Sequence, residues 1–122
     1  MKNRPFRHRL GFALWGISEA WRRERSFRTQ TLLGLAATLF TIMFAPRLIW
    51  AAAVALSIGL VLALELLNAA IEGVIDHLHP EAAPEIKLVK DIAAGAVLIA
   101  SIGAATVGLL MIASIFLHWS QQ

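Results

Sequence analysis

Long apolar segments separated by short polar ones predict a chain made of helices. Hydrophobic residues recur at helical spacing over residues 5–26, with arginines on the flanking faces, as in a helix that lies on a membrane surface. Three predominantly apolar segments follow, at about 29–45, 48–77 and 87–117. A membrane-spanning helix needs roughly 17–25 residues, so each segment is predicted to cross the bilayer. The expected fold is an all-α membrane protein, with an amphipathic surface helix and three transmembrane helices in a single domain over residues 1–122.

Prolines and polar residues mark where the predicted spans end. Pro46 and Arg47 end the first span, and two prolines four residues apart, Pro80 and Pro84, break the chain after the second. The first span is short, and a signal peptide is the competing interpretation. The basic segment that precedes it is long for a signal peptide, however, and no small-residue cleavage site follows it. We therefore expect three spans.

Composition supports a membrane protein. The 122 residues are 58% hydrophobic and 16% charged, whereas soluble domains carry about 25% charged residues. The mean hydropathy is +0.69. The sequence contains no cysteine, which excludes disulfides and cysteine-ligated metal sites.

Positive charge is concentrated at the start of the chain. Eight of the eleven Lys and Arg residues lie in the first 28 positions. Nucleic-acid binding is one interpretation of such a cluster, but nothing else in the sequence resembles a nucleic-acid-binding module. By the positive-inside rule, the N-terminus is predicted to be cytoplasmic. Three spans then place the loop around residues 76–91 on the cytoplasmic side and the C-terminus outside.

Four polar residues share one face of the second predicted span. At about 100° per residue, the spacing i, i+3, i+7, i+11 confines them to about 80° of the helix surface: Glu65, Asn68, Glu72 and Asp76. Ionisable groups close to hydrocarbon are costly and usually mark a functional site. Glu65 follows four apolar turns, so a structural role explains it poorly. Glu72 and Asp76, taken alone, also fit the solvated end of a helix.

Further charged residues are expected at the same depth. Glu24 precedes the first span, and Lys90 and Asp91 open the third, although this pair also fits an interfacial anchor and helix cap. Carboxylates suit Mg²⁺, which is usually held together with substrate phosphates, and a lysine can supply positive charge to a phosphate. Glu65 is the deepest carboxylate and the natural general base toward a lipid hydroxyl, while Glu72 is the natural metal ligand. Together these groups indicate phosphoryl transfer from a cytoplasmic nucleotide to a lipid alcohol.

Other chemistries fit the sequence less well. It has no Walker A motif, no glycine-rich loop after a strand and no soluble-kinase signature. A zinc site at His77 and His79 lacks further ligands at suitable spacing. The rival hypothesis is a small non-enzymatic oligomer that translocates cations along a path lined by Glu65 and Glu72. Lys90 argues against it, because a cation path has little use for a fixed positive charge.

The polar residues and their spacing resemble the bacterial integral-membrane diacylglycerol kinase family, which also includes the undecaprenol kinases of Gram-positive bacteria. The resemblance covers about residues 6–117. It rests on the pattern E-x-x-N-x-A-x-E-x-x-x-D from Glu65 to Asp76, on Lys90-Asp91 following Glu72 after 18 positions, and on residues 20–28 before the first span.

This resemblance implies a homotrimer in the bacterial cytoplasmic (inner) membrane, with ATP and Mg²⁺ bound in active sites shared between protomers. It implies that Glu65 is the catalytic base and that Asn68 orients Glu65 or the substrate, so that both contact the lipid alcohol. Glu24 and Glu72 would hold the metal. The nucleotide site would be lined by Glu24, Glu72, Asp76, Glu81, Ala82, Ala83, Lys90 and Asp91, with residues 81–83 near the adenosine.

Two positions and one segment bear on the acceptor. Ala69 stands where the family usually has Ser or Thr, and Gln30 stands where the diacylglycerol kinases typically carry Glu. Residues 93–98 look more like the undecaprenol branch. The expected function is therefore ATP-dependent phosphorylation of a membrane lipid alcohol at the cytoplasmic face. Both acceptors stay open: diacylglycerol, giving phosphatidic acid, and undecaprenol, giving undecaprenyl phosphate.

Overall fold

The computed structural model describes residues 2–122, which form helices and no strand. The all-helical prediction is confirmed. Three of the helices are long and apolar enough to cross a membrane, as their length and composition show. The helices are α1 (Phe6–Arg23), α2 (Arg25–Phe44), α3 (Leu48–Leu78) and α4 (Pro84–Trp119).

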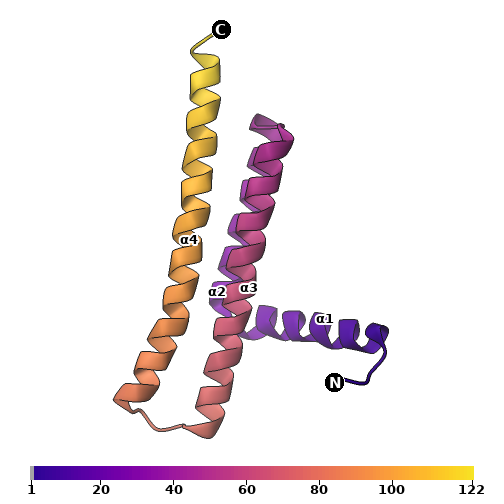
Figure 1. Ribbon diagram of the computed structural model, residues 1–122, viewed down its shortest axis with the longest axis vertical. Helices are drawn as coiled ribbons and strands as arrows, with labels where there is room; N and C mark the ends of the chain where they lie inside the picture. The colour runs from indigo at the N-terminus through magenta and orange to yellow at the C-terminus, as the bar shows by residue number, and fades with distance from the viewer. Residues whose placement is uncertain (1) are drawn as a thin grey trace.

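The three long helices run side by side, and α1 projects away from them crosswise, from a point beside α3 (Figure 1). Helix α3 is central: it packs against both α2 and α4, which make little backbone contact with each other. Residues 45–47 connect α2 to α3, and residues 79–83 connect α3 to α4 at the other end of the bundle. Because α3 has a helix on either side, polar side chains on its surface can meet partners from both.

A single residue separates α1 from α2. Glu24 has an extended backbone, with φ −101° and ψ 105°, and α2 begins at Arg25 rather than near residue 29 as expected. The Arg28 guanidinium donates to the carbonyl oxygens of Trp21 and Arg22, at 3.1 and 3.0 Å. These carbonyls belong to the last turn of α1, where a helix leaves its acceptors unpaired. Arg28 thus links the first turn of α2 to the last turn of α1 across the corner.

Helices α3 and α4 are longer than a bilayer requires. Their 31 and 36 residues correspond to lengths of about 46 and 54 Å at the usual helical rise. The hydrocarbon core measures only about 30 Å. Figure 1 shows that the ends of α3 and α4 joined by residues 79–83 extend past α1. The polar residues at these ends therefore lie beyond the level of α1.

The bundle has a thin interior and a largely apolar exterior. Large hydrophobic side chains are exposed along α2, α3 and α4, as suits helices that lipid surrounds. In the described chain two polar residues are buried, Thr41 and Glu65. The Thr41 hydroxyl donates to the carbonyl oxygen of Ala37 at 2.7 Å, within its own helix. Glu65 needs a partner from elsewhere, which makes it the starting point for the site.

Candidate functional site

The buried carboxylate of Glu65 receives a hydrogen bond from α2. Glu65 is only 6% exposed, and the Ser26 hydroxyl donates to its Oε1 at 2.6 Å. Within residues 2–122 this is the one hydrogen bond to the Glu65 side chain. A bond this short to a carboxylate is charge-assisted and stronger than a neutral one. It fixes one carboxylate oxygen and leaves Oε2 available for a substrate.

Asn68 and Glu72 follow on the same face of α3. The Asn68 side-chain amide donates to Glu72 Oε1 at 3.3 Å. The other polar atom of Asn68, Oδ1, is buried without a hydrogen-bond partner in the described chain. Leaving a buried acceptor unpaired costs about 1–3 kcal/mol. This unpaired oxygen lies about one turn along α3 from Glu65.

The polar face of α3 ends in an ion pair with α4. Lys90 Nζ contacts Asp76 Oδ1, and Lys87 pairs with Asp91 at 2.5 Å along α4. A cavity of about 290 Å³ opens beside the Asp76–Lys90 pair. It brings together five of the residues predicted to bind nucleotide, Asp76, Glu81, Ala82, Ala83 and Lys90.

Glu24 and Asp91 lie outside these groups. Glu24 lines a separate cavity of about 620 Å³ between α1 and α3, whose α3 wall is Leu66, Ala69, Ala70 and Gly73. Glu72 lies roughly 110° around α3 from the middle of that wall, so one chain does not place Glu24 and Glu72 on a common face. Asp91 is exposed. It pairs with Lys87 and does not line the cavity beside Asp76.

The carboxylate oxygens of these residues suit Mg²⁺ better than a metal ion that requires many protein ligands. In the described part of the chain, no group of three or more His, Asp and Glu side chains is arranged to hold a metal. Mg²⁺ needs only one or two carboxylates, because water and substrate phosphates supply the remaining ligands. Glu72 has one oxygen held by Asn68 and a second oxygen available, which fits such a partial site.

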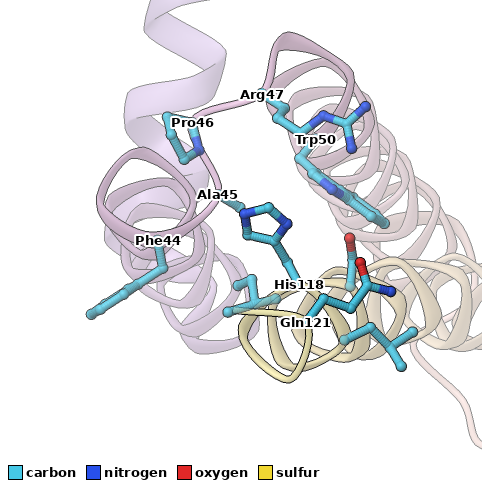
Figure 2. Close-up of a pocket in the computed structure, with 10 residues that line it drawn as sticks. Phe44, Ala45, Pro46, Arg47, Trp50, His118 and Gln121 are labelled. Carbon is cyan, nitrogen blue, oxygen red and sulfur yellow. The ribbon is translucent and has the colours of Figure 1, made fainter.

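The opposite end of the bundle has a different chemistry. A cavity of about 520 Å³ lies there, and Figure 2 shows Arg47, Trp50, His118 and Gln121 around it. None of the lining residues, all within the described range, is a carboxylate. The candidate carboxylates of α3 thus take no part in this cavity.

Ser26 is a site residue that sequence reasoning missed. It precedes Glu65 by 39 positions, and neither hydropathy nor spacing links the two. The only sequence signal is its place next to Glu24, in the segment 20–28 that carries part of the family resemblance.

Comparison with known proteins gives consistent matches. Residues 11–112 match the family described as prokaryotic diacylglycerol kinase. The chain is 41% identical over 98 residues to a diacylglycerol kinase of Synechocystis sp., a match that covers 80% of this chain and 56% of that protein. It is 34% identical over 96 residues to an undecaprenol kinase of Bacillus subtilis, covering 79% of this chain and 78% of the relative. The chain thus spans little more than half the length of the Synechocystis protein. All the candidate residues, from Glu24 to Asp91, lie inside the matched range.

Proposed function

Because this chain belongs to the prokaryotic diacylglycerol kinase family, we propose that it transfers the γ-phosphate of ATP to the hydroxyl of a membrane lipid alcohol. The predicted family is confirmed, and both relatives are named as kinases of lipid alcohols. The observation that carries the proposal is the buried Glu65 carboxylate, held by Ser26 at 2.6 Å and followed on the same face by Asn68 and Glu72. A purely structural helix does not need this series of polar groups.

In the proposed reaction Glu65 is the general base. Its Oε2 accepts the proton of the lipid hydroxyl while the hydroxyl oxygen forms a bond to the γ-phosphorus, and the bond from that phosphorus to the departing ADP oxygen breaks. The Ser26 hydrogen bond holds the carboxylate in one orientation. Asn68, about one turn farther along α3, would orient Glu65 or the substrate.

The metal and nucleotide groups lie farther along α3. Glu72 would hold Mg²⁺ together with the ATP phosphates, and the ion, when bound, supplies charge neutralisation during transfer. Glu24 is the second proposed metal carboxylate. Within one chain, Glu24 and Glu72 lie on different sides of α3. We therefore propose that Glu24 completes the metal site only in a homotrimer whose active sites are shared between protomers.

Lys90 would contact the ATP phosphates, in exchange for its present partner Asp76. Asp76 and residues 81–83 would line the nucleotide site, with Asp91 beside it. The extension of α3 and α4 past α1 supports a nucleotide site outside the hydrocarbon, if α1 lies on the membrane surface (Figure 1). This arrangement requires the positive N-terminal side to be cytoplasmic, as the charge distribution predicts.

The test is an ADP-release assay with purified protein in micelles, with Mg²⁺ and either diacylglycerol or undecaprenol as acceptor. Glu65→Gln keeps the size of the side chain and removes the base, so it should lose most of the turnover. Glu85→Gln is the matched control, because Glu85 is exposed in the first turn of α4. Absence of Mg²⁺-dependent turnover with both alcohols would refute the proposal, and cation flux into liposomes without ATP turnover would favour the rival translocator.

A further inference from the structure

The cavity of about 520 Å³ at the end of the bundle opposite residues 79–83 has a polar lining that the proposed function does not use. Arg47 and Trp50 line it from the start of α3, and Ser114, His118 and Gln121 line it from the end of α4. Figure 2 shows Trp50 on the side of α3 and Gln121 across from it on the side of α4. Its volume falls within the range of about 300–1,000 Å³ that is common for small-molecule sites.

Several hydrogen-bond donors around this cavity have no acceptor within residues 2–122. They are the guanidinium of Arg47, the indole N–H of Trp50, the hydroxyl of Ser114 and the side-chain amide of Gln121. Ser114 is half-buried, as is Trp50. Most hydroxyls on the long helices donate to a carbonyl oxygen of their own helix, as Ser57 does at 2.8 Å. Ser114 does not, so its hydroxyl is free to donate into the cavity.

Arg47 gives this end of the bundle a positive charge without a matching carboxylate. It is the only Lys or Arg in residues 29–86, and residues 25–64 and 92–122 contain no Asp or Glu. Glu65 follows Arg47 by 18 positions, which corresponds to about 27 Å along α3. No carboxylate side chain among the described residues lines the cavity. A positive charge beside several free donors favours an anionic ligand that is rich in acceptor oxygens.

The cavity lies at the level of a membrane surface. The separation of about 27 Å between Arg47 and Glu65 is close to the ~30 Å thickness of the hydrocarbon core, so the two residues lie near opposite boundaries of the bilayer. Tryptophan, here Trp50, is common at such a boundary. Phe44 and Leu117 line the cavity and are 49% and 64% exposed, so acyl chains of neighbouring lipids can pack against its rim. The anions most abundant at this level are the head groups of phospholipids.

We propose that this cavity binds the phosphate head group of an anionic phospholipid in the leaflet opposite the candidate catalytic site. The planar guanidinium of Arg47 donates two N–H groups to the phosphate oxygens, a geometry that arginine suits better than lysine. Trp50 and Ser114 donate further hydrogen bonds, and Gln121 binds a hydroxyl of a glycerol head group. Basic pockets between membrane helices are known to bind anionic head groups. Phosphatidylcholine binds more weakly, because its choline cation finds no carboxylate here.

A head group in this cavity links two helices that hardly touch. Helices α2 and α4 make little backbone contact with each other, yet both line the cavity, through Phe44 and His118 among others. A ligand that binds the folded protein and not the unfolded chain raises its stability in proportion to its occupancy. Anionic phospholipid should therefore stabilise the protein, whether or not the protein phosphorylates a lipid.

Thermal unfolding in neutral detergent micelles tests the site, with phosphatidylglycerol or phosphatidylcholine titrated into the micelles. Phosphatidylglycerol should raise the Tm, and phosphatidylcholine should need a several-fold higher mole fraction for the same effect. Arg47→Gln should weaken the effect of phosphatidylglycerol on the order of tenfold or more, because a charge-assisted contact is lost. Arg9→Gln is the matched control, since Arg9 is exposed on α1 and lies outside this cavity. Equal responses of these two variants would show that general surface charge attracts the lipid, and the proposal would be wrong.

A serine pair tests the contact without a change of charge. Ser114→Ala should keep the wild-type Tm in the absence of phospholipid, because its hydroxyl has no partner in the described chain, and should weaken the effect of phosphatidylglycerol about threefold or more. Ser57→Ala is the control, because Ser57 is half-buried on α3 and donates only to the carbonyl oxygen of Ala53. A wild-type response to phosphatidylglycerol in both Arg47→Gln and Ser114→Ala would overturn the proposal.

Photolabelling of the wild-type protein in bilayers locates the lipid. A phosphatidylglycerol with a diazirine near its glycerol backbone should label residues 44–50 and 114–121, and excess glycerol phosphate, which has no acyl chain, should not reduce that labelling. Strong competition by glycerol phosphate would assign the cavity to a soluble phosphate and refute the lipid. Label confined to α1, or a second copy of the chain cross-linked through the cavity, would also refute it. None of these measurements requires ATP turnover, so their failure is separate from failure of the kinase proposal.

Discussion

Replacing Ser26 with alanine tests the hydrogen bond that holds the proposed base. The Ser26 hydroxyl lies 2.6 Å from Glu65 Oε1, and Glu65 is 6% exposed, so little water can replace the lost donor. Hydrogen bonds to charged groups contribute about 1.5–3 kcal/mol. If that energy serves to orient Glu65 for proton transfer, Ser26→Ala should lower kcat by about ten- to a hundredfold. The KM for ATP should change little, because Ser26 does not line the cavity beside Asp76 and Lys90 that we propose for the nucleotide.

The ADP-release assay at saturating ATP measures this effect, with acceptor concentration varied to separate kcat from KM. Ser26→Thr keeps a hydroxyl and should recover most of the activity. Thr29→Ala is the matched control, since its hydroxyl donates only to the carbonyl oxygen of Arg25, within α2. A kcat of Ser26→Ala within twofold of wild type would refute the positioning role. Equal losses in Ser26→Ala and Ser26→Thr would assign the effect to packing instead of the hydroxyl.

Three further predictions concern the nucleotide, the metal and the packing. Lys90→Met should raise the KM for ATP on the order of tenfold or more, because it removes a charge-assisted contact to phosphate, whereas Lys87→Met, whose partner is Asp91, should change it less than threefold. Removal of divalent ions with EDTA should abolish turnover, and added Mg²⁺ should restore it. Gly34→Ala should lower the stability of the folded protein in detergent by about 1–2 kcal/mol, because overpacking against Ile58 exceeds the gain in helix propensity. A Cβ added at Gly59 would have no atom within 4 Å, so Gly59→Ala should be neutral or stabilising when both variants are compared by thermal unfolding.

Each of these predictions has an outcome that contradicts it. Equal ATP affinity in the Lys90 and Lys87 variants would remove Lys90 from the phosphate site. Full activity in EDTA would exclude a required Mg²⁺ ion. A Gly34→Ala protein as stable as Gly59→Ala would show that α2 and α3 separate easily at this contact.

Local pattern was enough to predict the helices and one face of the site. Helical periodicity depends on near neighbours in sequence, so three spans and the alignment of Glu65, Asn68, Glu72 and Asp76 on α3 follow from spacing alone. The carboxylates and Lys90 could also indicate phosphoryl transfer from sequence alone, because affinity for Mg²⁺ and for phosphate depends on the type of residue. Residues 79–83 form a short connection between α3 and α4, so the contact between Asp76 and Lys90 on either side of it was also within reach of sequence reasoning.

The tertiary structure decided what depends on how separate helices meet. The corner at Glu24 lies earlier than expected, Arg28 donates to the α1 carbonyls across it, and Ser26 in the first turn of α2 meets Glu65. A cavity of about 390 Å³ is lined by residues of α2, α3 and α4 together, so no single segment encodes it. Sequence alone thus determined which chemical groups the chain carries and which of them share a helix face. Contacts between residues 39 or 71 positions apart depend on the rotation and approach of whole helices, which are set by packing.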